Sequence, residues 1–248
     1  KTDKDYPYSW EEIRISEQEI GKLVAKAYLD ETGAEIAFEN AGGIRAGISA
    51  GDITYKDIIS ISPYGNVLVT KELTGKQVLA ILNHSQKLAK ECDAVYTLQK
   101  QAQEKGEDPY QYSWPDNSGS VLQFGGIEIE TDENNGIKSA TVGGVPVDEN
   151  KVYTVAMNHY MAEDSEYPAL VEAPLQKEYG TCEEALKSYI VSNYSGNEGK
   201  SEKEPATRGE VVQLLLDVAA GYNPGVQKSD IIKGYEDGEL HEDWLVTR

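Results

Sequence analysis

The sequence contains few of the side chains on which metal and nucleophile chemistry depends. Its 248 residues include two cysteines and three histidines. Cys92 and Cys182 belong to no C-x-x-C pair, which argues against a structural zinc site. None of the histidines stands in a D-x-H, N-H-D or H-x-H setting, so they cannot assemble a dinuclear metal centre. No G-x-S-x-G elbow is present, which leaves a serine hydrolase without support.

Positive charge is also scarce. The 23 basic residues are outnumbered by 43 acidic ones, and the formal net charge is −20. This balance argues against a nucleic-acid partner, although one or two arginines can still hold a small anion. We expect no membrane span, because no apolar run approaches the thickness of a bilayer. The first residues, KTDKDYPYSW, are not a signal peptide, so any export signal would lie upstream. We expect Cys92 and Cys182 to be buried thiols, with one disulfide as the alternative in an exported chain.

Residues 40–66 carry the strongest signal of a ligand site. Asn40 and Arg45 bracket Gly42 and Gly43, which allow the main chain to approach a ligand. Arg45 offers a fork of donors that matches a carboxylate or a phosphate. A P-Y-G-N turn follows, and it presents Tyr64 where a flat ring can stack. An isolated Gly-Gly pair would usually mark only a strand-to-loop turn, but the whole run is more specific.

Several further segments extend this signal into an ordered series of motifs. The motifs are NAGGIR at 40–45, GDITYKD at 51–57, SPYGN at 62–66, LTGK at 73–76, LQFGGIEIETD at 122–132 and VYTVAMNHY at 152–160. On these motifs, the chain over residues 12–195 resembles the C-terminal domain of the 5′-nucleotidases. The resemblance implies an α/β (α+β) fold of layered helices and sheet, and a substrate-binding role. It also implies that no cofactor binds this chain, because the two metal ions belong to a separate N-terminal metallophosphoesterase domain.

The resemblance also implies roles for individual residues. The family clamps a nucleobase between two aromatic rings, and Tyr64 matches the first of them. Tyr160 is our choice for the second ring, with His159 as the alternative, because the alignment of Asn158-His159-Tyr160 is ambiguous by one residue. We expect Asn40 to bond the edge of the base and Arg45 to face the phosphate. Half-buried packing residues are the alternative reading of the two tyrosines.

Two departures from the family put the ligand in question. Residues 163–167 read EDSEY in place of G-G-D-G-Y, so Asp164 can replace the ribose-binding aspartate only if the loop shifts. The early arginine that grips phosphate in several members aligns with Ser16, and Arg14 is a displaced substitute. A phosphate grip that rests on Arg45 alone would be weaker. The sequence therefore leaves the preferred nucleotide open.

Hydrophobic periodicity predicts the elements around these motifs. We expect an S-x-x-E capping box at Ser16 to begin a helix over 17–31, which ends near Gly33. The other predicted helices span 74–91 and 182–192. Residues 92–118 read as a surface insertion that packs its own aromatic side chains, with a lid as the alternative. The predicted strands cover 34–38, 57–61, 66–70, 121–131, 136–142 and 152–157.

The last fifty residues change in character. We divide the chain into a core at 1–195, a polar linker at 196–206 and a segment at 207–248. This segment resembles part of an S-layer homology repeat, through T-R-G-E at 207–210 and IIKGYEDG at 231–238. The resemblance implies an extracellular place on a bacterial cell surface or cell wall, with wall polysaccharide as a partner. A plain amphipathic helix with a turn is the alternative.

Together, these observations lead to one hypothesis and one rival. The hypothesis is a nucleotide- or nucleoside-binding domain of a cell-surface 5′-nucleotidase or 2′,3′-cyclic-nucleotide phosphodiesterase, a hydrolase of nucleotide catabolism. Such a fragment would be inactive without its metallophosphoesterase domain. The rival is a degenerate, non-enzymatic module that serves adhesion or spacing at the cell wall.

Overall fold

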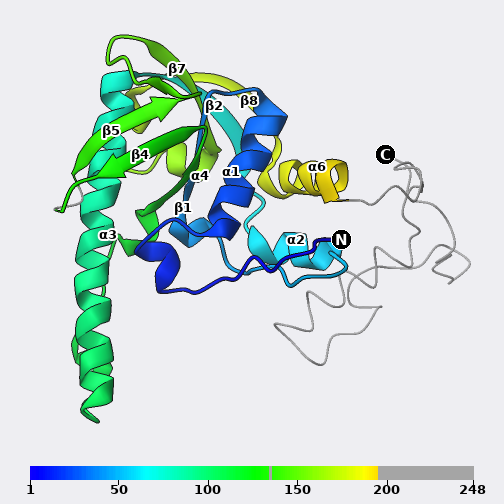
Figure 1. Cartoon of the computed structure of the whole chain (residues 1–248). Helices are drawn as coiled ribbons and strands as arrows, with labels where there is room; N and C mark the ends of the chain where they lie inside the picture. The colour runs from blue at the N-terminus through cyan, green and yellow to red at the C-terminus, as the bar shows by residue number, and fades with distance from the viewer. Residues whose placement is uncertain (134–135, 195–248) are drawn as a thin grey trace, which may run out of the picture. The chain divides into compact units, whose positions relative to one another are not determined.

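A five-stranded sheet forms the centre of the molecule in the computed structural model, which describes residues 1–133 and 136–194 (Figure 1). The strand order is β3-β1-β7-β2-β8. The strands are β1 (Ile36–Asn40), β2 (Val67–Thr74), β3 (Leu122–Gly125), β7 (Val152–Asn158) and β8 (Leu175–Thr181). β1 and β7 run parallel, and the other neighbours are antiparallel. The expected layered α/β fold is confirmed, and the expectations for residues 196–248 lie outside the described residues.

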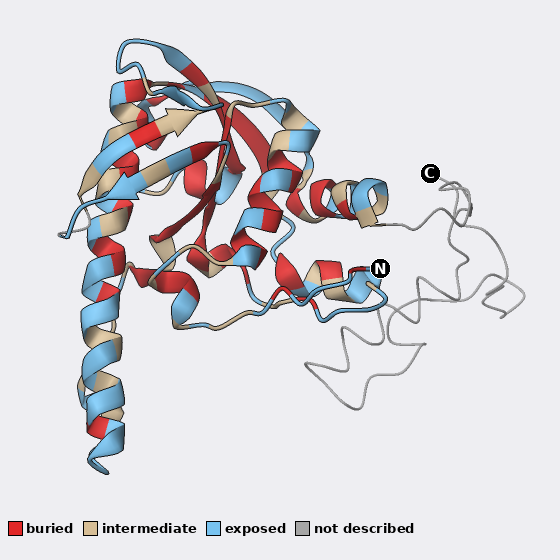
Figure 2. Ribbon diagram, in the orientation of Figure 1, coloured by how far each residue is buried: buried red, intermediate tan, exposed pale blue. Residues whose placement is uncertain are grey.

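Helices cover both faces of this sheet because its strands alternate apolar side chains between two cores. In β1, Ala37 packs into one buried cluster, whereas Ile36 and Phe38 pack into the other. This alternation follows from the period of two residues in a strand. The first cluster joins α1 (Glu19–Thr32), α2 (Tyr55–Ile61) and α6 (Cys182–Tyr194), together with the middle of α3 (Gly75–Glu104) around Cys92. The second joins the first turns of α3 and the small sheet of β4 (Ile127–Thr131), β5 (Ile137–Val142) and β6 (Val145–Pro146). The sheet and the facing sides of its helices carry most of the buried residues (Figure 2).

Two predictions, the cap of the first helix and the strand at 57–61, were wrong for local reasons. The S-x-x-E capping box does not form: α1 begins after Gln18, whose N–H donates to Gln123 Oε1 at 2.7 Å. Residues 57–61 are helix α2, not a strand. A capping box between Thr54 and Asp57 starts this helix, and both hydrogen bonds of the box are present. The T-x-x-D pattern at residues 54–57 indicates such a capping box, and sequence reasoning missed it. The predicted end of α1 is confirmed, since Gly33 adopts the left-handed conformation with a φ of 69°.

The helix after β2 is much longer than predicted. α3 has 30 residues, begins with a capping box of Thr74 and Gln77, and takes in the first half of the supposed insertion. The chain then returns along α3, where Trp114 Nε1 donates to Gln99 Oε1 at 3.1 Å. The Trp114 ring also meets Tyr96 and Trp10, with centroid distances of 6.0 and 5.0 Å. The insertion does pack its own aromatic side chains.

Smaller elements complete the fold. Sequence reasoning missed β8, α4 (His159–Ala162) and α5 (Pro168–Glu172), and short 3₁₀ turns lie at Glu12–Arg14, Ala41–Gly43, Pro109–Gln111 and Ser118–Ser120. Cys92 and Cys182 are buried and free, as expected. In the part of the chain that the structure describes, no helix has the length and apolarity needed to cross a bilayer.

Candidate functional site

One edge of the central sheet gathers the motifs, because of the strand directions. β1 and β7 are parallel, so the residues that follow them emerge at the same edge. β2 runs antiparallel to β7 and pairs Leu68 with Asn158, which brings the turn before β2 to that edge as well. The NAGGIR loop, the P-Y-G-N turn and α4 therefore meet. Ligands commonly bind at such strand ends in α/β sheets.

A cavity of about 470 Å³ lies at this edge. We call residues 40–43 and 64–66 its motif wall and residues 116–120 its clasp wall, and Tyr160 on α4 completes the lining. The lining residues are Asn40, Gly42, Gly43, Tyr64, Asn66, Asp116, Asn117, Gly119, Ser120 and Tyr160. Five of the predicted site residues thus come together here, namely Asn40, Gly42, Gly43, Tyr64 and Tyr160. The other four (Arg45, Asn158, His159 and Asp164) do not line the cavity.

Two solvent-accessible tyrosine rings face this cavity. Tyr64 is 55% exposed and Tyr160 is 62% exposed, so both side chains are accessible to a ligand in the cavity. His159 takes a different role, because its Nδ1 accepts the N–H of Val67 at 3.1 Å and so ties α4 to β2. Of the two residues considered for the second ring, only Tyr160 lines the cavity.

Asn158 lies under the motif wall and holds it in place. Its side chain is buried, and its Oδ1 accepts the N–H of Met161 at 2.8 Å, which caps α4. Its Nδ2 donates to Glu39 Oε1 at 2.9 Å and to Asn40 Oδ1 at 3.0 Å. If the Asn40 amide turns over, its oxygen instead accepts the N–H of Gly43 at 3.1 Å. Asn158 is therefore a positioning residue, and the cavity presents Asn40.

Glu39 is a buried carboxyl that sequence reasoning missed. Burial raises the pKa of Glu39 to about 7, against the lowering effect of hydrogen bonds from Tyr28, Asn158 and the main chain of Asn40. Tyr28 donates to its Oε2 at 2.5 Å. A Cβ at Gly43 would overlap with Glu39 Oε1. The second glycine of the motif is thus required by close packing against Glu39.

Lys71 anchors α4, which carries Tyr160, and α5, which follows the EDSEY loop. Its ammonium group is buried and donates to the carbonyls of Ala162 and Leu170, at 3.0 and 2.6 Å. These carbonyls belong to α4 and α5, where free carbonyl groups attract a cation. Desolvation lowers the pKa of Lys71. No local pattern signals this role, because a lysine in a strand usually faces solvent.

Arg45 and Arg14 are two cations whose charges interact, and neither of them lines the cavity. Arg45 is exposed, and its main-chain N–H donates to Ile61 O at 2.9 Å. Arg14 is buried with its guanidinium group 3.9 Å from the centroid of the Trp10 ring, and its Nε has no hydrogen-bond partner among the described residues. Desolvation is the main cause that lowers the pKa of Arg14, and the charge of Arg45 lowers it further. The two guanidinium groups are thus close enough to repel each other.

Asp164 does not line the cavity, and both of its oxygens accept hydrogen bonds from the protein. Oδ2 accepts the hydroxyl of Ser120 at 2.8 Å, and Oδ1 accepts the N–H of Glu166 at 3.0 Å. A further hydrogen bond joins the EDSEY loop to Ser120, because the Tyr167 hydroxyl donates to the Ser120 carbonyl oxygen at 2.6 Å. Glu166 also meets His84 Nε2 at 2.5 Å. The altered EDSEY loop therefore clasps residues 118–120 to the fold.

Five lining residues were missed: Asn66, Asp116, Asn117, Gly119 and Ser120. Asn66 stands inside the recognised P-Y-G-N turn and could have been named from it. Residues 116–120 carry no motif, and they reach the cavity only because the chain folds back along α3. Gly119 touches the motif wall, where a Cβ on Gly42 would lie 3.3 Å from Gly119 O.

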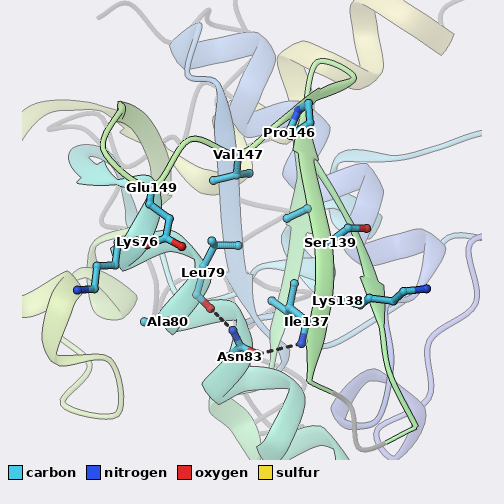
Figure 3. Close-up of a pocket in the computed structure, with 11 residues that line it drawn as sticks. Lys76, Leu79, Ala80, Asn83, Ile137, Lys138, Ser139, Pro146, Val147 and Glu149 are labelled. Atoms are coloured by element: carbon cyan, nitrogen blue, oxygen red, sulfur yellow. Dashed lines mark hydrogen bonds between the residues drawn. The ribbon is translucent and has the colours of Figure 1, made fainter.

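A second cavity, of about 550 Å³, lies between α3 and the small sheet (Figure 3). Leu79, Ile137 and Val147 lie along it, and Asn83 bridges α3 and β5 by accepting the N–H of Ile137 at 2.9 Å. Its described lining contains no aromatic side chain, so it cannot stack a base. Within residues 1–133 and 136–194, no group of three or more His, Cys, Asp or Glu side chains is placed to hold a metal ion.

The chain is similar to known nucleotidases. The family model described as 5′-nucleotidase, C-terminal domain, matches residues 3–172. Protein UshA of Escherichia coli K12 is 32% identical over 182 residues, which cover 73% of this chain and 28% of that protein. A 5′-nucleotidase of Vibrio vulnificus is 28% identical over 183 residues, with the same coverage of 73% and 28%. The chain thus spans under a third of the length of these relatives.

Solved structures agree on the fold. The crystal structure of a 5′-nucleotidase precursor from Thermus thermophilus superposes with a TM-score of 0.61. The two are 24% identical in sequence, and the match covers 81% of this chain and 37% of that one. The Haemophilus influenzae NAD nucleotidase has a TM-score of 0.56 at 20% identity, covering 77% of this chain and 34% of that chain. At these identities, the likeness establishes the architecture alone.

Proposed function

Because the chain belongs to the 5′-nucleotidase C-terminal domain family, we propose that residues 1–194 bind a nucleoside or nucleotide as the substrate-recognition part of a larger phosphoesterase. The observation that carries this proposal is the placement of two exposed tyrosine rings, Tyr64 and Tyr160, on one cavity with the NAGGIR loop. A nucleobase is a flat, mostly apolar ring with hydrogen-bonding edges. The cavity offers faces to stack on and an amide, from Asn40, to bond an edge.

Stacking supplies most of the affinity in this proposal. A base stacked on an aromatic side chain gains about 1 to 3 kcal/mol. Rings that are already exposed and held on a turn or a helix need little reorganisation to receive a base. Asn40 then discriminates between base edges, because Asn158, which also bonds to Glu39, holds the Asn40 amide from below.

The phosphate of a nucleotide would leave the cavity toward Arg45. The described lining contains no lysine or arginine, and Asp116 gives it a negative group, so the cavity suits the uncharged part of the ligand. Arg45 stands at the end of the loop that begins with Asn40, and Arg14 lies near enough for their charges to interact. An anion near Arg45 would relieve this repulsion.

Calorimetric titration with adenosine and AMP tests the proposal. Tyr64→Ala should weaken adenosine binding by about 1 to 3 kcal/mol, and Tyr160→Ala by a similar amount. Arg45→Ala should weaken the binding of AMP and leave the binding of adenosine unchanged. Tyr110→Ala is the matched control, because Tyr110 is 84% exposed and lines neither cavity. If the unaltered chain binds neither ligand at millimolar concentration, the proposal fails.

The activity of the whole protein belongs to the same proposal. We propose a cell-surface or secreted 5′-nucleotidase or 2′,3′-cyclic-nucleotide phosphodiesterase, with the dimetal site in a separate metallophosphoesterase domain. This chain alone should then hydrolyse none of AMP, UDP-glucose and 2′,3′-cyclic AMP in the presence of Mn²⁺, as measured by chromatography of the nucleotides. Turnover that persists through rigorous purification would contradict this division of labour.

The rival function is a structural module at the cell wall. The observation that favours it is the clasped EDSEY loop, in which Asp164 bonds to Ser120 and Glu166 and does not line the cavity. We propose that residues 207–248 contribute wall-polysaccharide binding in either case. Sedimentation of the intact chain with purified bacterial cell walls tests this contribution. Wall binding together with silent nucleoside titrations would favour the rival.

A further inference from the structure

One carboxylate faces the cavity from the clasp wall. Among the described residues that line it, Asp116 is the only one with a charged side chain. Asp116 is exposed, and no other described residue forms a hydrogen bond or an ion pair with it. A free carboxylate opposite stacking rings has two oxygens with which to accept hydrogen bonds.

The other carboxylates of this region are already occupied. Asp164 accepts from Ser120 and from the main chain of Glu166. Glu166 pairs with His84, and a side-chain hydrogen bond from Asn117 lowers its pKa. A ligand would have to displace these bonds to reach either residue. Asp116 requires no such exchange.

The chemistry of a nucleoside identifies what a free carboxylate can bind. The base has a flat face for the tyrosines, and the phosphate of a nucleotide is repelled by a carboxylate. The ribose carries two adjacent hydroxyl groups, which are donors that one carboxylate can receive together. Such hydrogen bonds to an ionised acceptor are stronger than neutral ones.

We infer that Asp116 binds the adjacent hydroxyls of the ligand's ribose, and that it makes the cavity selective for ribonucleosides over their deoxy forms. This inference rests on the proposed function. It assigns the sugar contact to the clasp wall rather than to the EDSEY loop. The loop instead positions this wall.

The neighbours of Asp116 are fixed on both sides. Before it, Trp114 bonds to Gln99 on α3. After it, Ser120 donates to Asp164 and accepts the hydroxyl of Tyr167 at its carbonyl oxygen. The main chain that carries Asp116 is thus held on both sides, so that presenting the carboxylate to a sugar needs little rearrangement of the backbone.

Titrations of the intact chain with adenosine, 2′-deoxyadenosine and 2′,3′-dideoxyadenosine test the inference. The unaltered chain should bind adenosine about 10- to 100-fold more tightly than the dideoxy form, the range expected for hydrogen bonds to a charged group. Asp116→Asn should weaken the binding of adenosine by most of this factor and leave the affinity for the dideoxy form nearly unchanged. The preference for ribose should therefore collapse.

Two variants make the outcome specific. Asp93→Asn removes the same charge from an exposed position on α3 and should leave every affinity unchanged. Asp164→Asn should lower thermal stability but keep the preference for ribose. If Asp164→Asn abolishes the preference and Asp116→Asn does not, the inference is overturned in favour of the loop.

The test also separates this inference from the proposed function. If Tyr64→Ala weakens adenosine but Asp116→Asn keeps the preference, nucleoside binding stands and the role of Asp116 is refuted. An unaltered chain that does not distinguish adenosine from its dideoxy form refutes it equally. If the chain binds no nucleoside at all, both fall together.

Discussion

The two walls of the cavity are held by different kinds of contact. The motif wall rests on buried groups, because Asn158 bonds to both Glu39 and Asn40 inside the fold and Gly43 packs against Glu39. The clasp wall rests on hydrogen bonds between partly exposed groups, from Ser120 to Asp164 and from the main chain of Glu166 to Asp164. Buried polar groups are costly to leave unpaired, whereas exposed ones can exchange partners with water. We therefore expect the motif wall to tolerate far less change than the clasp wall.

A pair of glycine substitutions provides the strongest test of this difference. Gly43→Ala should destabilise the fold by about 3 kcal/mol, because the new methyl group would overlap with the buried Glu39 Oε1. Gly119→Ala on the clasp wall is the matched control. Its Cβ would have no described neighbour closer than 3.7 Å, so the cost should stay below about 1 kcal/mol. Urea unfolding measures both, and equal costs would refute the comparison.

The pH dependence of stability gives the next largest effect. The pKa of Glu39 rises from an ordinary value of 4.5 to about 7 on folding. The folded chain therefore holds an extra proton between these pH values, and stability falls as the pH rises through this window. The loss that Glu39 causes should approach about 3 kcal/mol at most.

Glu39→Gln isolates this contribution. Unfolding free energies of both proteins between about pH 5 and pH 8 should converge or cross, because only the unaltered chain carries the Glu39 penalty at high pH. Parallel curves for the two proteins would show that Glu39 does not titrate in this window. The amide keeps an acceptor for Tyr28, whose hydroxyl now donates to the carboxyl.

The stability that the clasp wall contributes should depend on pH more weakly than that of Glu39, and in the opposite direction. Hydrogen bonds from Asn117 and His84 lower the pKa of Glu166 below 4.5. The stability that ionised Glu166 contributes is thus present above pH 4.5. It is lost as the pH falls through the pKa of Glu166 in the folded chain. Glu166→Gln should cost less than about 1 kcal/mol at neutral pH, because the pair is partly exposed. Glu172→Gln, an exposed change on α5, is the control. A cost that grows toward acid pH would contradict this assignment.

Local sequence predicted much of the fold where the signal was short-range. The end of α1 at Gly33 and strands β1, β5 and β7 are confirmed, because a left-handed cap and apolar runs act within a few residues. The strand predicted at 57–61 was wrong, since Ile58 and Ile61 suit either element and the Thr54–Asp57 cap decides for a helix. β8 was missed because most of its side chains are exposed and carry no apolar alternation.

The sequence by itself determined the family, the layered fold and the motif wall, whose glycines and aromatic turn lie close together along the chain. Only the tertiary structure decided the rest of the site. The parallel pairing of β1 with β7 brings α4 to the loop, so that Tyr160 rather than His159 lines the cavity. The return of the chain along α3 delivers Asp116, and the bond from Ser120 withdraws Asp164. The pairing of β1 with β7 and the bond from Ser120 to Asp164 join residues more than forty positions apart, and no local pattern of residues encodes such pairings.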